Sequence, residues 1–363
     1  MAGDLFYRLP PGTDVLRLRG GDLLLRSDTV AARLEGRSAK LFGEQILPLL
    51  DGRRTVAEVA AELSIGTDDL ASHLASLAEQ GVLRRSYGPA ERAPDAHALA
   101  PLLEMLEALG VPEEAGRQRL ERSRIAVFGL EGAGAHLAHL LARCGVGTLV
   151  LVDPYPAEAG DLAAAPLSCD ALGNSRQAAM RARIERDGFA GEIVTPAARE
   201  LGRESVADFA RDCDLLVSCF DRGFLAAHHW INRVSIERCI PAVYAEVRGR
   251  TALVGPLVIP AETGCYLCYR MRSIACEEDF AAAMEYEEYL DYRKRPALHR
   301  RAFLPPVGAT VAGILALESL KCLVLPTPPS LAGTVLELDT LTLEIERHRV
   351  LRQPGCPACR EVV

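Results

Sequence analysis

Four cysteines in two Cys-x-x-Cys pairs carry the clearest chemistry in this sequence. Cys265 and Cys268 form one pair, and Cys356 and Cys359 form the other. Each pair can hold a metal ion from a tight turn, and four thiolates complete the tetrahedral shell that zinc prefers. Two redox dithiols are the alternative. Because all four positions would be protein thiolates, none remains for water, and we expect a structural zinc clip.

A glycine-rich loop follows the first predicted strand of the larger part of the chain. Gly129, Gly132 and Gly134 stand where the chain turns from this strand into a helix. Backbone N–H groups in such a loop commonly bind the phosphates of a nucleotide. Asp153 ends the next strand, about twenty residues further on, where a ribose-binding acid would lie. The alternative is a Rossmann-like turn that serves only the packing of helix on sheet.

Alternating strands and helices must position both features. Apolar runs predict strands at 124–128, 148–152, 214–219 and 242–247, with a late hairpin at 334–339 and 343–350. A helix pattern runs from the glycine loop to Cys144. This order indicates an α/β domain with a mostly parallel sheet. Residues 307–325 are apolar but contain Glu318 and Lys321, so they predict a buried helix and no membrane span.

The first 88 residues predict a separate module. Strand-like runs at 15–18, 22–26 and 29–34 precede three helical patterns, of which the second starts at the capping box of Thr55 and Glu58. Three short strands and three helices indicate a winged-helix-like module. Its third strand would offer an open sheet edge, and its third helix would form one wall of an apolar groove. A peptide-binding module needs both features.

Six side chains of this module are candidate contacts for a guest peptide. They lie on the third strand and the third helix: Val30, Ala32, Leu34, Leu70, His73 and Leu77. Core packing is the alternative for the leucines of the helix, and an ordinary surface position is the alternative for His73. A DNA-binding winged helix is a further alternative. The third helix carries Asp68, Asp69 and Glu79 and no Lys or Arg, so DNA phosphates would repel it.

The composition limits the partners and the compartment. The chain has 363 residues and a net charge of −8, which disfavours nucleic acids and membrane surfaces because both are negatively charged. Its polar start does not resemble a secretory signal, so we expect a cytoplasmic protein with reduced thiols. We predict four segments: the module at 1–88, a linker and helix at 89–122, a Rossmann-like domain at 123–262, and a crossover, helix, hairpin and zinc-binding segment at 263–363.

The stretch 124–250, together with the cysteine pairs, resembles the ThiF/MoeB-type adenylating fold related to ubiquitin-activating enzymes. This resemblance implies that Asp221 corresponds to a magnesium-binding acid and Arg176 to a phosphate-binding lysine. Two departures affect phosphate binding: Glu131 replaces a loop glycine, and Ala164 replaces a clamping arginine. Adenylation depends on clamping and neutralising phosphates. We therefore expect a vestigial nucleotide site, no catalytic residue, and no use of ATP by this chain.

Residues 10–85 resemble PqqD-like peptide-recognition modules. A PqqD-like module joined to a degenerate ThiF-like domain resembles the ocin-ThiF-like proteins of thiazole/oxazole-modified microcin and thiopeptide pathways, with close local matches at 255–268 and 348–359. The resemblance implies a homodimer that binds the leader of a ribosomally made precursor peptide and delivers it to a separate ATP-dependent YcaO cyclodehydratase. The alternative is an active adenylating enzyme that acts on a peptide carboxylate, with Cys276 as an acyl-carrying thiol.

Overall fold

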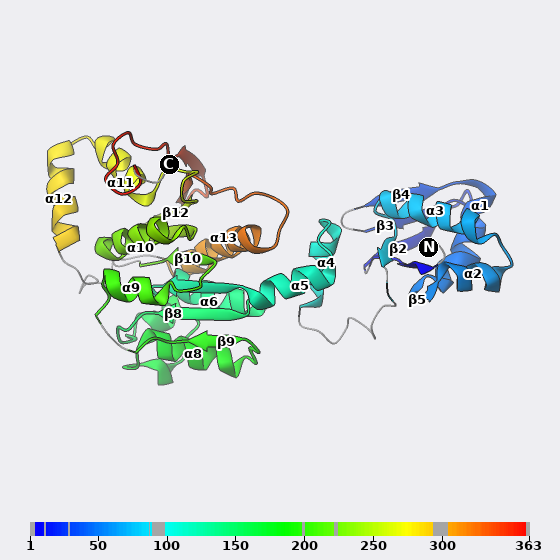
Figure 1. Cartoon of the computed structure of the whole chain (residues 1–363), viewed down its shortest axis with the longest axis horizontal. Helices are drawn as coiled ribbons and strands as arrows, with labels where there is room; N and C mark the ends of the chain where they lie inside the picture. Colours follow the sequence, from blue (N-terminus) through cyan, green and yellow to red (C-terminus); the bar gives the residue numbers. More distant parts are fainter. Residues whose placement is uncertain are drawn as a thin grey trace. The chain divides into compact units, whose positions relative to one another are not determined.

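The chain forms two compact units, Met1–Glu113 and Glu114–Val363. The computed structural model in Figure 1 describes residues 4–10, 12–27, 30–86, 88, 99–197, 200–220, 224–292 and 304–360. The boundary falls inside the segment for which the sequence predicts a linker and a helix. We describe each unit by itself.

The described residues of the first unit form two small antiparallel sheets. One joins three strands that follow one another in the chain, β2 (Asp14–Arg17), β3 (Leu23–Arg26) and β4 (Ala31–Leu34). These strands coincide with the predicted runs. The other has the order β5 (Asp51–Thr55), β1 (Phe6–Arg8) and β6 (Arg84–Ser86). The sequence did not predict this second sheet, because its strands are three to five residues long and lack an alternating apolar pattern.

Helices follow the strands of the first unit as predicted. They are α1 (Gly36–Leu41), the short turns η2 (Phe42–Ile46) and η3 (Leu47–Leu49), α2 (Val56–Leu63), α3 (Thr67–Glu79) and α4 (Ala100–Ala108). The predicted capping box starts α2: the Glu58 N–H donates to Thr55 Oγ1, and the Thr55 N–H donates to the Glu58 carboxylate. Leu23, Leu25 and Leu74 are buried in one core between these helices and sheets.

The second unit is built on one mixed sheet. The described residues form eight strands in the order β14-β13-β12-β11-β10-β7-β8-β9. Five run parallel: β7 (Arg124–Phe128), β8 (Thr148–Val152), β9 (Glu192–Val194), β10 (Leu215–Ser218) and β11 (Ala242–Arg248). Three extend the sheet antiparallel: β12 (Thr251–Val258), β13 (Thr334–Asp339) and β14 (Ile345–Arg349). The predicted α/β class and mostly parallel sheet are therefore confirmed.

Helices surround this sheet (Figure 1). They are α5 (Glu113–Arg122), α6 (Ala133–Arg143), α7 (Asp161–Ala164), the turn η5 (Cys169–Ala171), α8 (Arg176–Arg186), α9 (Arg203–Phe209), α10 (Leu225–Arg238), α11 (Tyr266–Ala275), α12 (Phe280–Tyr292) and α13 (Pro305–Leu323). Side chains of β7 alternate between the two faces: Phe128 joins a core with α9 and α10 residues, so its neighbour Val127 points to the opposite face.

Helix α13 is the long apolar helix that the sequence predicted. Among the described residues it alone is long and apolar enough to cross a membrane, with a mean hydropathy of 1.4. However, 50% of that window is buried inside the protein, and the helix packs against α6, β11 and β12. Its apolar composition is therefore explained by its place in the core.

Candidate functional site

The four cysteines of the two pairs converge in the second unit. Cys265, Cys268, Cys356 and Cys359 are all buried, and their sulfur atoms lie within 4.8 Å of one another. The Sγ atoms are 3.8 Å apart for Cys265–Cys268 and for Cys265–Cys356, and 3.6 Å apart for Cys268–Cys359. Four sulfurs around an ion with bonds of about 2.3 Å would be about 3.8 Å apart. The cluster could therefore bind a tetrahedral metal ion.

Local backbone geometry brings the two pairs together. Cys265 caps the N-terminus of α11, which places Cys268 in the first helical turn. A Cβ on Gly264 would lie 3.0 Å from the carbonyl oxygen of Val350, so the two chain segments touch through backbone atoms. The Gln353 N–H donates to Cys268 Sγ at 3.3 Å. The cluster thus joins α11 to the segment that follows β14.

Hydrogen bonding within the cluster shifts the pKa values of its thiols in different directions. The hydrogen bond from Cys265 lowers the pKa of the Cys268 thiol to about 4, whereas the same bond and burial raise the pKa of Cys265. Burial raises the pKa of Cys359 to about 11. A bound cation would favour the thiolate form of all four side chains.

The glycine loop packs tightly between β7 and α6. Gly129 has φ +84°, and a Cβ there would lie 2.8 Å from the Cys219 carbonyl carbon. A Cβ on Gly134 would lie 1.9 Å from the Gly129 carbonyl oxygen. Both glycines are therefore required for packing alone, with no ligand considered.

Helix α13 covers the start of α6, where phosphates bind in proteins with such a loop. A Cβ on Gly308 of α13 would lie 3.3 Å from the backbone nitrogen of Ala133 and 3.4 Å from the carbonyl carbon of Gly132. All residues from 128 to 135 are buried. The backbone at this helix start is consequently buried, and α13 lies close to Gly132 and Ala133.

Arg176 lies at the centre of a buried cluster of carboxylates. Its Nε lies 2.9 Å from Asp161, and its Nη1 lies 3.5 Å from Asp153 and 3.9 Å from Glu131. Arg176, Asp153 and Asp161 are fully buried, and Glu131 is 4% exposed. Burial raises the pKa of Asp153, while Arg176 and the Leu130 N–H oppose this shift. One cation thus serves three carboxyl groups, which leaves no spare positive charge for a phosphate.

A family model described as "ThiF family" matches residues 105–358. This chain belongs to the ThiF family. The matched range includes both the glycine loop and the Arg176 cluster. The Arg176 guanidinium faces the chain's own carboxylates.

Similar proteins support the same fold. The molybdopterin-synthase adenylyltransferase of Escherichia coli (strain K12) is 24% identical over 246 residues, which cover 67% of this chain and 90% of that protein. A crystal structure of E. coli MccB with ATP matches with a TM-score of 0.70 at 18% identity, covering 97% of this chain and 99% of that chain. The microcin C7 biosynthetic enzyme MccB in complex with N-formylated MccA matches with a TM-score of 0.71 at 18% identity and the same coverage.

The candidate peptide contacts of the first unit differ in burial. Val30, Ala32 and Leu34 are half-buried on the core side of the β2-β3-β4 sheet. On α3, Leu70 is buried in the core and Leu77 is half-buried, whereas His73 is exposed.

The backbone of β4 alternates between its partner strand and the open edge. The Ser27 N–H donates to the Val30 carbonyl, and the register pairs Leu25 with Ala32. Hydrogen-bonded and non-bonded pairs alternate in an antiparallel ladder, so the N–H and C=O groups of Ala31 and Arg33 point away from β3. The six predicted peptide contacts did not include Ala31 and Arg33, because the direction of their backbone groups depends on how β3 pairs with β4.

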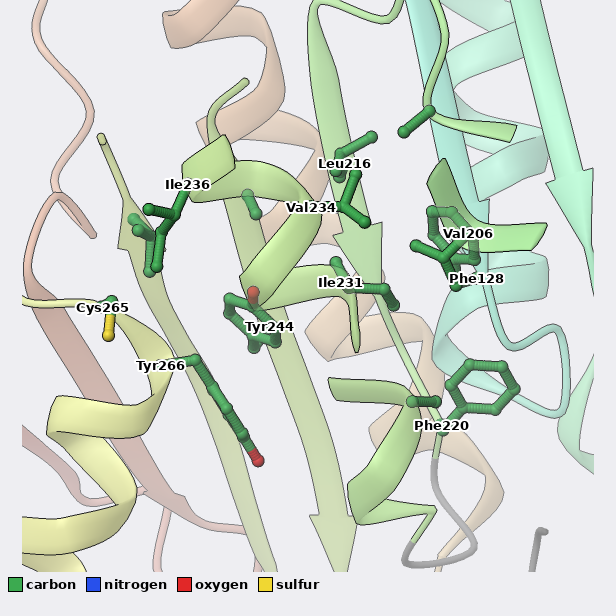
Figure 2. Close-up of a cluster of buried hydrophobic side chains, with 14 of the residues drawn as sticks. Phe128, Val206, Leu216, Phe220, Ile231, Val234, Ile236, Tyr244, Cys265 and Tyr266 are labelled. Atoms are coloured by element: carbon green, nitrogen blue, oxygen red, sulfur yellow. The ribbon is translucent and has the colours of Figure 1, made fainter. Parts of the chain in front are cut away.

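A second buried polar cluster escaped the sequence analysis. Ser218 Oγ lies 2.7 Å from His228 Nδ1, and the His228 ring lies against Tyr244 and Tyr266, whose rings stack at 4.3 Å. Figure 2 shows Tyr244 and Tyr266 in this core. Burial lowers the pKa of His228 to about 4, so the ring is neutral at pH 7. The adjoining cavity of about 10 Å³ holds one water-sized group, which is too small for a substrate.

Two predicted positions remain, Asp221 and Cys276. Asp221 lies outside the described residues. Cys276 is exposed at the C-terminal end of α11, beside the exposed carboxylates of Glu277 and Glu278.

Proposed function

We propose that this chain binds the leader of a ribosomally made precursor peptide and delivers it to a separate YcaO-type cyclodehydratase. The observation that carries the proposal is the open edge of β4. Ala31 and Arg33 offer outward N–H and C=O groups there, and a guest strand could pair with them. Residues 1–88 would be the PqqD-like winged-helix module that captures the leader.

Tethering explains how such a chain would promote a reaction that it does not perform. A bound leader keeps the core peptide near the partner's active site, and a short flexible link gives an effective concentration on the order of millimolar. The structure of MccB with N-formylated MccA supports the proposal by analogy, since that ThiF-like protein also holds a peptide.

We further propose that the nucleotide site is vestigial. The observation that favours this reading is the pairing of Arg176 with Asp153 and Asp161. Phosphate chemistry needs cations that face the ligand, and this cation is fully buried among carboxylates. Glu131 adds a further negative charge within 3.9 Å of Arg176. An incoming triphosphate would meet repulsion and the covering helix α13.

The metal of the cysteine cluster would be structural zinc. Four thiolates at tetrahedral spacing leave no open position for water. Bound zinc would neutralise the buried thiolates and hold the two segments together. We also propose a cytoplasmic homodimer, as the resemblance to the ocin-ThiF-like proteins implies.

Fluorescence anisotropy with a labelled leader peptide tests the main proposal. We expect tight binding to the wild-type chain and a loss of at least about tenfold in Ala31→Pro, because proline removes an outward N–H at an edge. Val15→Pro is the matched control. It lies on β2, the opposite edge of the same sheet, and its N–H also points outward because the Leu18 N–H donates to Asp22 across the same ladder. Equal binding by both variants and the wild type would refute the proposed edge.

An active adenylating enzyme is the second candidate function. The observation that favours it is the likeness to MccB with ATP and to an adenylyltransferase. ATP–pyrophosphate exchange with the purified chain and the precursor peptide separates the two. The scaffold proposal expects no exchange above background, and exchange at an enzyme-like rate would overturn it.

A further inference from the structure

A buried histidine lines a small cavity in the second unit. His228 of α10 is 2% exposed. Its Nδ1 lies 2.7 Å from Ser218 Oγ, whereas its Nε2 is buried with no hydrogen-bond partner among the described residues. Nε2 lies on the side of the ring away from Ser218, and the ring lines a cavity of about 10 Å³. A buried polar group without a partner is costly, which favours a partner from outside the polypeptide.

The cavity lies beside an irregular stretch of the sheet. The register pairs Val243 with Leu257 and then Ala245 with Val254. One residue of β11, Tyr244, therefore lies opposite two residues of β12, and such a bulge disrupts the ladder locally. Tyr244 also lines the cavity, as does Tyr266, whose ring stacks on that of Tyr244 (Figure 2). The cavity thus lies where the regular pairing of β11 and β12 is interrupted.

Size and charge restrict what this cavity can bind. Its volume is about the space that one water molecule needs. Among the described residues that line it, Glu246 alone is charged, and Arg248 Nη2 lies 2.7 Å from Glu246 Oε2. This arginine already neutralises the carboxylate and would repel a cation, whereas the carboxylate would repel an anion. A neutral water can both accept and donate a hydrogen bond, so it suits a histidine on one side and a carboxylate on the other.

We propose that the cavity binds one water molecule, which accepts a hydrogen bond from His228 Nε2 and donates one to the Glu246 carboxylate. A neutral imidazole carries a single N–H group, so the Ser218 hydroxyl then donates to Nδ1. The donors all point the same way, from Ser218 through His228 and the water to a carboxylate, and hydrogen bonds in such a chain strengthen one another. The water would therefore link the end of β10 to β11 through α10.

A crystal structure of the full chain that resolves ordered waters is the direct test. We expect one water about 2.7–3.2 Å from His228 Nε2 and at a similar distance from a Glu246 carboxylate oxygen. A cavity without a water, or an ion identified there by anomalous scattering, would overturn the proposal. His228→Phe keeps an aromatic ring, removes both nitrogens and should lose the water. Ser218→Ala is the matched control and should keep it, because Nε2 remains. Loss of the water from both variants, or from neither, would contradict the assignment to Nε2.

NMR of the full chain with ¹⁵N-labelled histidine tests the site in solution and needs no variant. We expect the His228 ring to carry its proton on Nε2, and this proton to exchange with solvent at least about tenfold more slowly than the ring proton of the exposed His73. A proton on Nδ1, or equal exchange on the two rings, would overturn the proposal. Neither readout involves a leader peptide, so the outcome is independent of the proposed function.

Discussion

Replacing Arg176 with methionine would measure how much the positive charge of Arg176 contributes to the stability of the fold around the buried carboxylates. Methionine keeps much of the side-chain volume and removes the charge that faces Asp161 at 2.9 Å and Asp153 at 3.5 Å. A fully buried carboxylate without a cation binds a proton. Protonating one such group at pH 7 from an ordinary pKa of 3.8 costs about 4 kcal/mol, because each pKa unit is worth about 1.4 kcal/mol. This agrees with the roughly 3–5 kcal/mol for breaking a buried ion pair.

The pH dependence of this loss is the stronger test. In the variant the folded-state pKa of the carboxyl lies above its unfolded value, so the destabilisation disappears below the unfolded pKa and grows as the pH rises. Because burial already raises the pKa of Asp153 in the wild type, these values are upper limits. We expect the free energy of unfolding to fall by at most about 4 kcal/mol at pH 7 and by at most about 1.6 kcal/mol at pH 5.

Urea unfolding followed by circular dichroism at both pH values measures the difference from the wild type. Arg181→Met is the matched control, because Arg181 lies on the same helix and forms an exposed i,i+4 pair with Glu185. The free energy of unfolding of Arg181→Met should fall by less than about 0.5 kcal/mol. The reasoning about Arg176 fails if its variant loses less than about 1 kcal/mol at pH 7, or loses the same amount at pH 5.

Three further predictions follow from the second unit. Because burial lowers the pKa of His228 to about 4 from an unfolded value near 6.5, the wild type should lose about 2 kcal/mol between pH 7 and pH 5, as the unfolded chain binds the extra proton. His228→Gln should flatten that part of the urea-unfolding profile, and an unchanged slope would contradict the assignment. Elemental analysis should find one zinc per chain. Cys356→Ser or a chelator should remove the zinc and lower the melting temperature. A metal-free wild type as stable as the zinc-loaded protein would count against the zinc clip. Gly134→Val should prevent folding or cost more than about 3 kcal/mol, because its side chain would meet the Gly129 carbonyl, and a soluble variant with wild-type unfolding would refute this packing role.

Long apolar runs and fixed motif spacing made much of the fold predictable. Strands β7 and β8 lie where the sequence placed them, and the capping box of Thr55 and Glu58 starts α2. The strand β12 was missed because Gly255 and Pro256 interrupt its apolar run. The short strands of the β5-β1-β6 sheet carry too little local pattern, and pairing between distant segments forms them.

The candidate sites also differ in whether the sequence alone could predict them. The cysteine pairs could be found from spacing alone, because metal ligands need a fixed number of sulfurs at short intervals. The Arg176 cluster could not be predicted from the sequence, because only the fold brings Asp161 close to Arg176. The one hint in the sequence was Glu131, which stands in the glycine loop and lies 3.9 Å from Arg176. The Ser218–His228 pair was likewise hidden, because nothing in the sequence shows that one strand end faces that helix.

The cysteine cluster also has a topological consequence. Cys265 and Cys356 are 91 residues apart in the chain, so a bound ion closes a ring of polypeptide that contains α12, α13 and the β13-β14 hairpin. Closing a loop of this length restricts the unfolded chain by about 4–5 kcal/mol in the cross-link model. Loss of the ion would then release a constraint on the unfolded chain that spans α13, the helix whose Gly308 lies close to the glycine loop.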